Sequence, residues 1–211
     1  MEAVIVAAGE LDTSFQTYLN AAKLIIAADG GGDYLLKLGI VPKVVIGDFD
    51  SISPEAVAKF KTSGSKLIQV EREKDETDTE LAVQYALRCG VRDIVILGAL
   101  GGRLDHTLAN LILLARLAKD GIRARAATPS LTVHAVTGQL VISGNAGELV
   151  SVFPFQGPAK GVTETGFKYS LKDADLDPFA VVGISNELAG PQGVIQVKKG
   201  VLLVFHYHSC R

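Results

Sequence analysis

The feature that most constrains the fold is a series of short, continuous apolar runs in the first half of the chain. Most of these runs end at or near a glycine or an aspartate, and mixed segments separate one run from the next. A run that is apolar on both faces is typical of a parallel strand whose sheet is covered by helices on both sides. The runs are residues 3–9, 24–31, 44–48, 66–70 and 93–102.

Helix signals lie between these runs. Residues 53–61 begin with Ser-Pro-Glu, which supplies an N-cap, a first-turn proline and an acidic first turn. Thr77 and Glu80 have the spacing of a capping box, and Gly90 is expected to end the helix that they begin. A further amphipathic helix is predicted over residues 105–119. The alternation of strand and helix predicts an α/β fold with a parallel, doubly wound, Rossmann-like sheet.

The composition of the chain changes near residue 128. From Thr132 onward the helical period disappears, and short strand-like segments alternate with turns that contain glycine, proline or asparagine. This pattern predicts a separate antiparallel β domain. The expected domains are therefore residues 1–127 and 132–211.

Composition excludes several classes of protein. The 211 residues are 48% hydrophobic and 21% charged, which fits one large or two small folded domains. The net charge of -2, without a basic stripe, argues against nucleic acid as the main partner. No apolar run approaches the ~20 residues that span a bilayer, and the N-terminus lacks the basic region of a signal peptide. Cys89 and Cys210 fit reduced thiols, so a cytoplasmic protein without a membrane anchor is expected.

Acidic and glycine-rich segments follow the predicted strands. In open α/β sheets, ligands bind outside the carboxyl ends of the strands. Asp29, Asp48 and Asp50 lie at such ends, and so do residues 71–78 and 98–105. We therefore expect these segments to meet at one edge of the sheet.

Asp48 and Asp50 suggest a metal site. They are two residues apart, so they would face the same way in an extended chain. A divalent cation could offset their repulsion, and Mg²⁺ is typically held by one or two carboxylates together with substrate phosphates. The alternative is that Asp48 caps a turn and Asp50 begins a loop. With Asp75 and Asp78 nearby, at the start of a predicted helix, we favour metal binding.

The glycine-rich turn at Gly101 and Gly102 suggests phosphate binding. Glycines allow backbone N–H groups to approach a phosphate, and Arg103 could clamp it. Asp105 and His106 open the helix that follows, and a simple tight turn is the alternative.

Two other features are ambiguous. Gly30 and its glycine neighbours allow either close approach of a nucleotide or only a sharp bend, and Lys74 could meet a phosphate or solvent. The chain contains neither a P-loop nor a GxGxxG fingerprint. Taken together, these residues predict a Mg²⁺-dependent enzyme that acts on phosphates.

The motifs also resemble those of a known family. Thiamine pyrophosphokinases carry similar motifs in the same order and at similar spacing, and the resemblance spans nearly the whole chain. The motifs are ADGG (28–31), GDFDS (47–51), EKDETD (73–78), GGRLDH (101–106), TGFKYSL (165–171) and ISNEL (184–188).

The resemblance implies a fold and an activity. It implies an α/β catalytic domain that binds the nucleotide and magnesium, followed by a β-sandwich domain that binds thiamine. The implied reaction transfers pyrophosphate from ATP to the hydroxyethyl oxygen of thiamine, and it yields thiamine diphosphate and AMP. A homodimer is also implied, with thiamine between the α/β domain of one subunit and the β domain of the other.

The resemblance and the residue chemistry together predict the site. The expected catalytic residues are Asp48, Asp50, Asp75, Asp78 and Arg103. The expected metal ligands are Asp48, Asp50 and Asp78. The expected nucleotide-binding residues are Asp29, Gly30, Lys74, Thr77, Gly101, Gly102, Arg103, Asp105 and His106. The expected substrate-binding residues are Asp78, Ser185 and Asn186.

One departure from the family concerns the aromatic partner of thiamine. Some members place a tryptophan in the last strands, and this chain has no tryptophan. Phe205 or Tyr207 could face the cationic thiazolium ring instead, or both could be ordinary residues of the β domain. Lys168 is either a ligand or a solvated charge.

Two other functions are alternatives to a pyrophosphokinase. An Asp-x-Asp pair after a strand also occurs in phosphohydrolases that use an aspartyl-phosphate intermediate, although there it usually follows the first strand. A nucleotide-binding sensor without catalysis is the other alternative, and it has less need for so many carboxylates.

Overall fold

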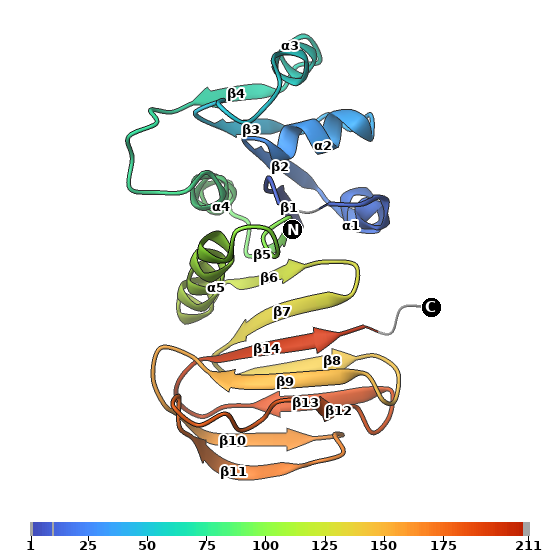
Figure 1. Ribbon diagram of the computed structural model, residues 1–211, viewed down its shortest axis with the longest axis vertical. Helices are drawn as coiled ribbons and strands as arrows, with labels where there is room; N and C mark the ends of the chain where they lie inside the picture. The colour runs from blue at the N-terminus through green and yellow to red at the C-terminus, as the bar shows by residue number, and fades with distance from the viewer. Residues whose placement is uncertain (1, 10, 209–211) are drawn as a thin grey trace. The chain divides into compact units, whose positions relative to one another are not determined.

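The computed structural model describes residues 2–9 and 11–208 (Figure 1). The chain divides into two compact units. Unit 1 is Met1–Asn110 with Ala126–Thr128, and unit 2 is Leu111–Arg125 with Pro129–Arg211. Strand β6 (Arg123–Ala127) and helix α5 (Leu104–Lys119) each contribute residues to both units.

Unit 1 is built on a parallel sheet. Its strands are β1 (Glu2–Val6), β2 (Leu24–Ala28), β3 (Val44–Gly47), β4 (Lys66–Gln69) and β5 (Asp93–Leu97). They lie in the order β5-β1-β2-β3-β4, and every neighbouring pair is parallel. In the register, Ile5 of β1 pairs with Ile26 on one side and with Ile96 on the other. The predicted parallel sheet is confirmed.

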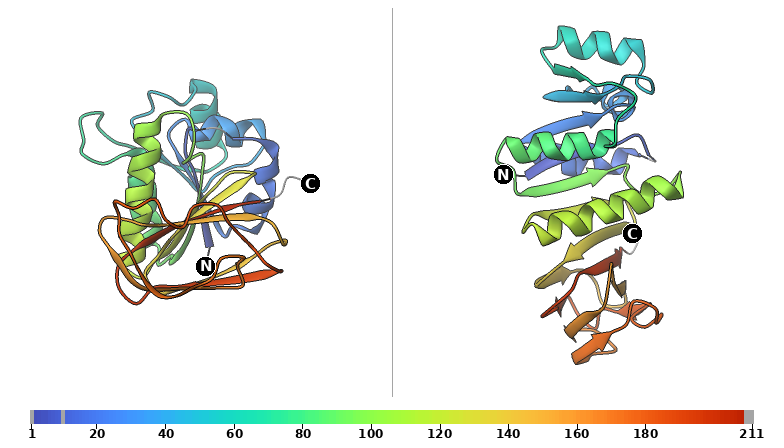
Figure 2. Two further views of the ribbon diagram at one scale, coloured as in Figure 1. Left: turned by 60° about the horizontal axis from the view of Figure 1, so that its bottom comes forward. Right: turned by 90° about the vertical axis from the view of Figure 1, so that its left-hand side faces the viewer.

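Helices cover both faces of this sheet. Helices α1 (Gln16–Ala21), α2 (Gly31–Lys37) and α3 (Pro54–Thr62) lie on one face, and α4 (Asp78–Arg88) lies on the other (Figure 1). Figure 2 (right) shows α4 in front of the strands. Val4 and Val45 pack in one core cluster with Phe60 of α3. The alternate positions Ile5 and Ile96 are also fully buried. Burial of both faces confirms the doubly wound arrangement.

The helix caps form as the sequence predicts. Ser53 Oγ accepts a hydrogen bond from the backbone N–H of Ala56 at 3.2 Å, and Thr77 Oγ1 accepts one from that of Glu80 at 3.2 Å. Gly90 follows α4 with a φ of 80°, in the left-handed region that favours glycine at a helix end.

Helix α2 is not anticipated by the sequence, because it begins with two glycines, which are poor helix formers. A Cβ at Gly31 would lie 2.0 Å from the carbonyl oxygen of Val6, and one at Gly32 would lie 2.4 Å from Ile52 Cδ1. Gly31 therefore allows the helix to pack closely on β1, and Gly32 allows it to pack closely on Ile52.

Unit 2 contains antiparallel strands in two sheets. One set, in the order β12-β9-β14-β7, belongs to a sheet of ten strands, and the other is a four-stranded sheet in the order β11-β10-β13-β8. A buried apolar cluster that includes Val152, Ile195 and Val204 draws side chains from both sheets, which confirms the predicted β-sandwich. The strands are β7 (Leu131–Val136), β8 (Gln139–Ser143), β9 (Leu149–Pro154), β10 (Ala159–Thr165), β11 (Leu171–Leu176), β12 (Asn186–Glu187), β13 (Gln192–Gln196) and β14 (Leu202–Tyr207).

The helices and the cysteines bear on the predicted absence of a membrane anchor and of a disulfide scaffold. Within residues 2–9 and 11–208, no helix combines the length and the apolarity that crossing a membrane requires. Cys89 is exposed at the end of α4, and Cys210 lies outside the described residues.

Candidate active site

A cleft of about 830 Å³ opens at the carboxyl ends of the strands of unit 1. Its walls come from the segments that follow β1, β2, β3 and β5 and from the loop before α4. This is where ligands bind in open α/β sheets. The predicted site residues that line the cleft are Asp29, Asp48, Asp50, Lys74, Thr77, Asp78, Gly101, Gly102, Arg103 and His106. Gly30, Asp75 and Asp105 are not among the residues that line it.

A tight turn, rather than an extended strand, brings Asp48 and Asp50 together. Strand β3 ends at Gly47, and Phe49 between the two aspartates has a φ of 64°. Asp48 Oδ1 accepts a hydrogen bond from the backbone N–H of Asp50 at 3.1 Å. The expectation of an extended chain is therefore wrong here. Phe49 packs against the core of unit 1, which anchors the turn.

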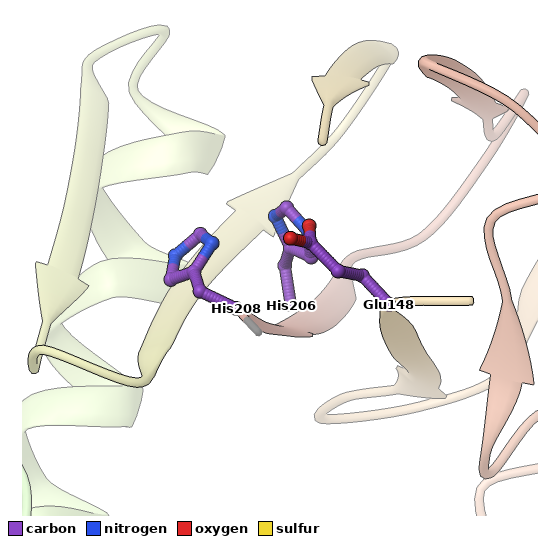
Figure 3. A group of neighbouring side chains, drawn as sticks. All are labelled: Glu148, His206 and His208. Atoms are coloured by element: carbon purple, nitrogen blue, oxygen red, sulfur yellow. The ribbon is translucent and has the colours of Figure 1, made fainter. Parts of the chain in front are cut away.

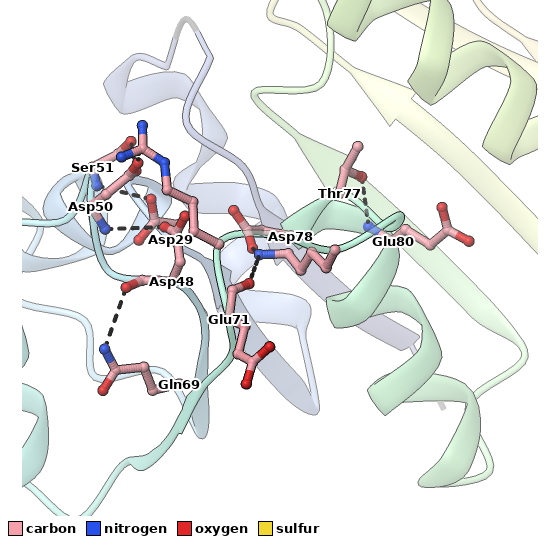
Figure 4. A network of polar contacts seen from close by, with 11 residues as sticks. Asp29, Asp48, Asp50, Ser51, Gln69, Glu71, Thr77, Asp78 and Glu80 are labelled. Atoms are coloured by element: carbon pink, nitrogen blue, oxygen red, sulfur yellow. Dashed lines mark hydrogen bonds and ion pairs between the residues drawn. The ribbon is translucent and has the colours of Figure 1, made fainter.

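Asp29 joins these two carboxylates at the floor of the cleft (Figure 4). One carboxylate oxygen from each of Asp29, Asp48 and Asp50 lies within 4.8 Å of the others. Gly47 permits this approach, because a Cβ there would lie only 2.7 Å from the Cβ of Asp29. The backbone N–H of Ser51 donates to Asp29 Oδ2 at 3.1 Å.

The electrostatics of Asp29 favour a cation. Its side chain is buried, and Oδ1 has no hydrogen-bond partner within the described part of the chain. Burial raises the pKa of Asp29, and the charges of Asp78 and Asp48 raise it further, while hydrogen bonds from Ser51 oppose the rise. A hard divalent cation takes carboxylate oxygen ligands, so this donor set fits Mg²⁺.

Asp78 has a cationic neighbour within the chain. Lys74 Nζ lies 2.9 Å from Asp78 Oδ1, and both side chains are mostly shielded from solvent. Lys74 Nζ also donates to the carbonyl oxygen of Glu71 at 3.4 Å. The carboxylate of Asp78 is not part of the group of three, although its charge still raises the pKa of Asp29. Lys74 therefore lies at the cleft as the partner of a carboxylate.

Arg103 is held at the edge of the cleft by Asp105. Its Nε and Nη2 donate to the two carboxylate oxygens at 3.2 and 2.6 Å. Asp105 also accepts from the backbone N–H of His106 at 3.0 Å. The hydrogen bond from Arg103 lowers the pKa of Asp105 to about 2. The pair is exposed, so the guanidinium is oriented before a ligand arrives yet stays accessible to one.

The structure adds residues that the sequence did not single out. Ser51 Oγ donates to Asp50 Oδ1 at 2.8 Å, and Arg72 Nη2 lies 3.4 Å from Asp50 Oδ2. Buried Asn110 donates from Nδ2 to the carbonyl oxygen of Ala99 at 2.8 Å and so fixes the loop after β5. Ser51 lies within the GDFDS motif, which is a signal that the sequence did contain.

In unit 2, the side chain of Asn186 is engaged within the protein. Its Oδ1 accepts from the backbone N–H groups of Tyr169 and Glu187 at 3.0 and 2.9 Å. Its Nδ2 donates to the carbonyl oxygen of Tyr169 at 2.7 Å and to Glu164 Oε2 at 2.9 Å. The amide is thereby saturated. Ser185 beside it is exposed and has a φ of 57°. Asn186 therefore holds the backbone, and Ser185 is the accessible member of the pair.

The residues that could face a thiazolium ring differ in their surroundings. Phe205 stacks edge-to-face on Phe153 with ring centroids 5.8 Å apart, whereas Tyr207 is 44% exposed. Lys168 Nζ lies 2.9 Å from Glu187 Oε1 and 5.6 Å from the ring centroid of Tyr169. Lys168 is therefore ion-paired on an exposed surface.

Glu164 gives a prediction for the pH dependence of stability. Its side chain is buried, and Oε1 has no hydrogen-bond partner among residues 2–9 and 11–208. Burial raises its pKa above 4.5, although the hydrogen bond from Asn186 opposes the rise. A carboxyl with a raised pKa binds its proton more tightly in the folded state. Its contribution to stability is complete below pH 4.5 and is lost as the pH rises through the folded pKa.

The variant Glu164→Gln cannot ionise, so its stability is expected to fall less above pH 4.5. At neutral pH we expect it to exceed the wild type by about 1 kcal/mol, because a neutral amide costs less to bury than an unpaired charge. Urea unfolding over a series of pH values measures this. Glu73→Gln, at an exposed position, is the matched control and should follow the wild type. Parallel profiles for wild type and Glu164→Gln would contradict the prediction.

The fold and the cleft together define a class of protein. A parallel α/β sheet with clustered carboxylates and an arginine side chain at its carboxyl edge is typical of enzymes that bind a phosphate-bearing substrate. Comparison with known proteins narrows this class. Residues 15–126 match the family described as "Thiamin pyrophosphokinase, catalytic domain", and residues 139–202 match "Thiamin pyrophosphokinase, vitamin B1 binding domain".

Individual relatives agree with these matches. The chain is 33% identical over 189 residues to the thiamine pyrophosphokinase of Bacillus subtilis (strain 168), which covers 89% of this chain and 88% of the relative. A crystal structure of thiamine pyrophosphokinase from Bacillus subtilis superposes with a TM-score of 0.89 at 30% identity, over 100% of both chains. A crystal structure of thiamin pyrophosphokinase from Geobacillus thermodenitrificans superposes with a TM-score of 0.87 at 28% identity, over 99% of this chain and 98% of the other.

The chain belongs to the thiamine pyrophosphokinase family, and it is an enzyme of that family. The resemblance noted in the sequence motifs is confirmed.

Proposed function

We propose that the protein transfers the pyrophosphoryl group of ATP to the hydroxyethyl oxygen of thiamine, with Mg²⁺ as the cofactor. The products are thiamine diphosphate and AMP. The observation that carries this proposal is the group formed by Asp29, Asp48 and Asp50 at the floor of the cleft, within the segment that matches the family's catalytic domain.

The carboxylates at the cleft floor are proposed to hold Mg²⁺. Asp48 and Asp50 retain the role predicted from the sequence, and Asp29 is added because its buried Oδ1 lacks a partner among the residues described. A bound Mg²⁺ would neutralise charge on the phosphates of ATP and hold them in position. Asp78 is proposed either to bind the same Mg²⁺ or to act on the thiamine hydroxyl. It lies close enough to these carboxylates that its charge raises the pKa of Asp29.

Asp78 or Asp75 is proposed to orient the thiamine hydroxyl and accept its proton. Asp78 lines the cleft and is ion-paired with Lys74, whereas Asp75 is exposed on the preceding loop. Arg103 is proposed to stabilise negative charge on the transferred group, because Asp105 already fixes the orientation of its guanidinium.

The two predicted domains are proposed to bind different substrates. Residues 1–127 would bind ATP and Mg²⁺, and residues 132–211 would bind thiamine. Support for the second role comes from the family match over residues 139–202 and from exposed Ser185, whose backbone N–H donates to Ser151 Oγ at 3.0 Å. A homodimer and a cytoplasmic location are proposed from the sequence and the family resemblance.

The test is to incubate the full chain with ATP, Mg²⁺ and thiamine and to separate the products by chromatography. Equal amounts of thiamine diphosphate and AMP are expected, and chelation of Mg²⁺ with EDTA should stop both. Release of free phosphate without thiamine would support a hydrolase instead. Tight ATP binding without turnover on thiamine would support a sensor.

A further inference from the structure

Unit 2 contains a second group of side chains with the chemistry of metal ligands. One ligand atom from each of Glu148, His206 and His208 lies within 4.8 Å of the others. Glu148 is 5% exposed and His206 is 3% exposed, and His208 is half-buried. Figure 3 shows the imidazole of His206 against the carboxylate of Glu148, with His208 beside them. None of these residues belongs to the site described above.

The strand register explains why these side chains converge. His206 of β14 pairs with Val150 of β9 on one side and with Thr132 of β7 on the other. Val150 belongs to the buried core of the sandwich, so His206 also points toward the interior. Glu148 and His208 are each two residues from a member of this row, which favours the same face. The group therefore lies at the end of the sandwich core.

Two members of the group have polar contacts with residues outside it. Within the group, His206 Nε2 lies 2.8 Å from Glu148 Oε2. Asn145 Nδ2, outside it, donates to Glu148 Oε1 at 2.9 Å. The ring nitrogen Nε2 of His208 lies 2.8 Å from Thr132 Oγ1. Metal-binding histidines and carboxylates typically make such outer contacts, which fix the ring tautomer and orient the ligand atoms.

We propose that Glu148, His206 and His208 bind a divalent transition-metal ion of the zinc class, in addition to the carboxylate site of unit 1. Two imidazoles and one carboxylate select zinc, cobalt or nickel over Mg²⁺, which prefers oxygen ligands alone. In a tetrahedral zinc site, ligand atoms at about 2.0–2.1 Å from the ion are ~3.3 Å from each other. The 2.8 Å between His206 Nε2 and Glu148 Oε2 needs only a small adjustment to accept an ion.

The experiment titrates the full chain, freed of metals and then saturated with Mg²⁺, with Co²⁺ and with Zn²⁺. The absorption spectrum of bound Co²⁺ reports nitrogen ligation and coordination geometry, and competition with a chelator gives the affinity. His208→Gln removes one ligand at a half-buried position. Thr132→Val removes the contact to His208 and is expected to weaken binding about 10-fold. Lys172→Gln, at an exposed position of β11 outside the group, is the control.

The proposal expects one Co²⁺ site with nitrogen ligands, from which Zn²⁺ displaces Co²⁺. His208→Gln should weaken binding by more than Thr132→Val does, and Lys172→Gln should leave it unchanged. Histidine ring resonances in the ¹⁵N NMR spectrum of the wild type provide a test without variants, and those of His206 and His208 should shift on addition of Zn²⁺. Unshifted rings, or equal affinity in wild type and a folded His208→Gln variant, would leave only a hydrogen-bonded Glu148–His206 pair and overturn the proposal.

Discussion

The variant Asp48→Asn is expected to lose Mg²⁺-dependent formation of AMP and thiamine diphosphate, by on the order of 100-fold to 1,000-fold, while it remains folded. The expected loss follows from the charge of the cluster, because asparagine removes one of three carboxylates that lie within 4.8 Å of one another. The fold should survive because asparagine keeps the oxygen that accepts the 3.1 Å hydrogen bond from the backbone N–H of Asp50. Initial rates with ATP, thiamine and varied Mg²⁺ measure the effect.

The control for this prediction is Asp120→Asn, which neutralises an exposed carboxylate that does not line the cleft. Its rate should match that of the wild type, and circular dichroism with thermal unfolding should show that both variants are folded. A folded Asp48→Asn variant with full activity would remove Asp48 from the site. An activity that recovers at high Mg²⁺ concentration would locate the defect in metal affinity.

The variant Gly31→Ala is expected to destabilise unit 1 severely, by about 3 kcal/mol or more. Helix propensity alone predicts the opposite sign, because alanine is better than glycine in a helix by about 1 kcal/mol. The steric term should outweigh it, since a Cβ at Gly31 would lie 2.0 Å from Val6 O and 2.6 Å from Val6 C. Both atoms belong to the backbone of a buried strand, which cannot move aside cheaply. Urea unfolding of the variant measures the net effect.

Gly138→Ala is the matched control, because a Cβ at Gly138 would meet no atom within 4 Å. Its stability should stay within about 0.5 kcal/mol of that of the wild type. If Gly31→Ala proved as stable as this control, or more stable, helix propensity rather than close packing would govern the start of α2.

Much of the fold could be predicted from the sequence because the signals are local. The runs of β1, β2, β3 and β5 are buried on both faces, so these strands can be recognised without knowledge of their neighbours, whereas β4 at the end of the sheet is only partly buried. Ser53 and Thr77 cap their helices through contacts only three residues away. The start of α2 could not be predicted in this way, since Gly31 and Gly32 fit there only through their contacts with Val6 and Ile52.

The same distinction between local and distant contacts applies to the candidate site. Asp48 and Asp50 could be assigned to one site because they are close in sequence, although the turn at Phe49 that joins them was not foreseen. The partners of Asp29 could not be read from spacing, because Ser51 and the charges that raise its pKa lie in other segments of the chain. Lys74 is four residues before Asp78, but the two lie on either side of the start of α4, so the spacing rule for helices did not predict their ion pair.

The sequence by itself determined the order of the strands of unit 1 along the chain and the helix caps at Ser53 and Thr77, because apolar runs and caps are local signals. It also determined the edge of the sheet at which the acidic residues meet, because the segments after parallel strands lie at the same edge. Only the tertiary structure decided which side chains from distant segments lie together. It brought Asp29 to Asp48 through the close approach at Gly47, and it joined Glu148 to His206 across 58 positions of sequence. The physical reason is that these contacts depend on strand register and side-chain direction, which burial of the whole core fixes.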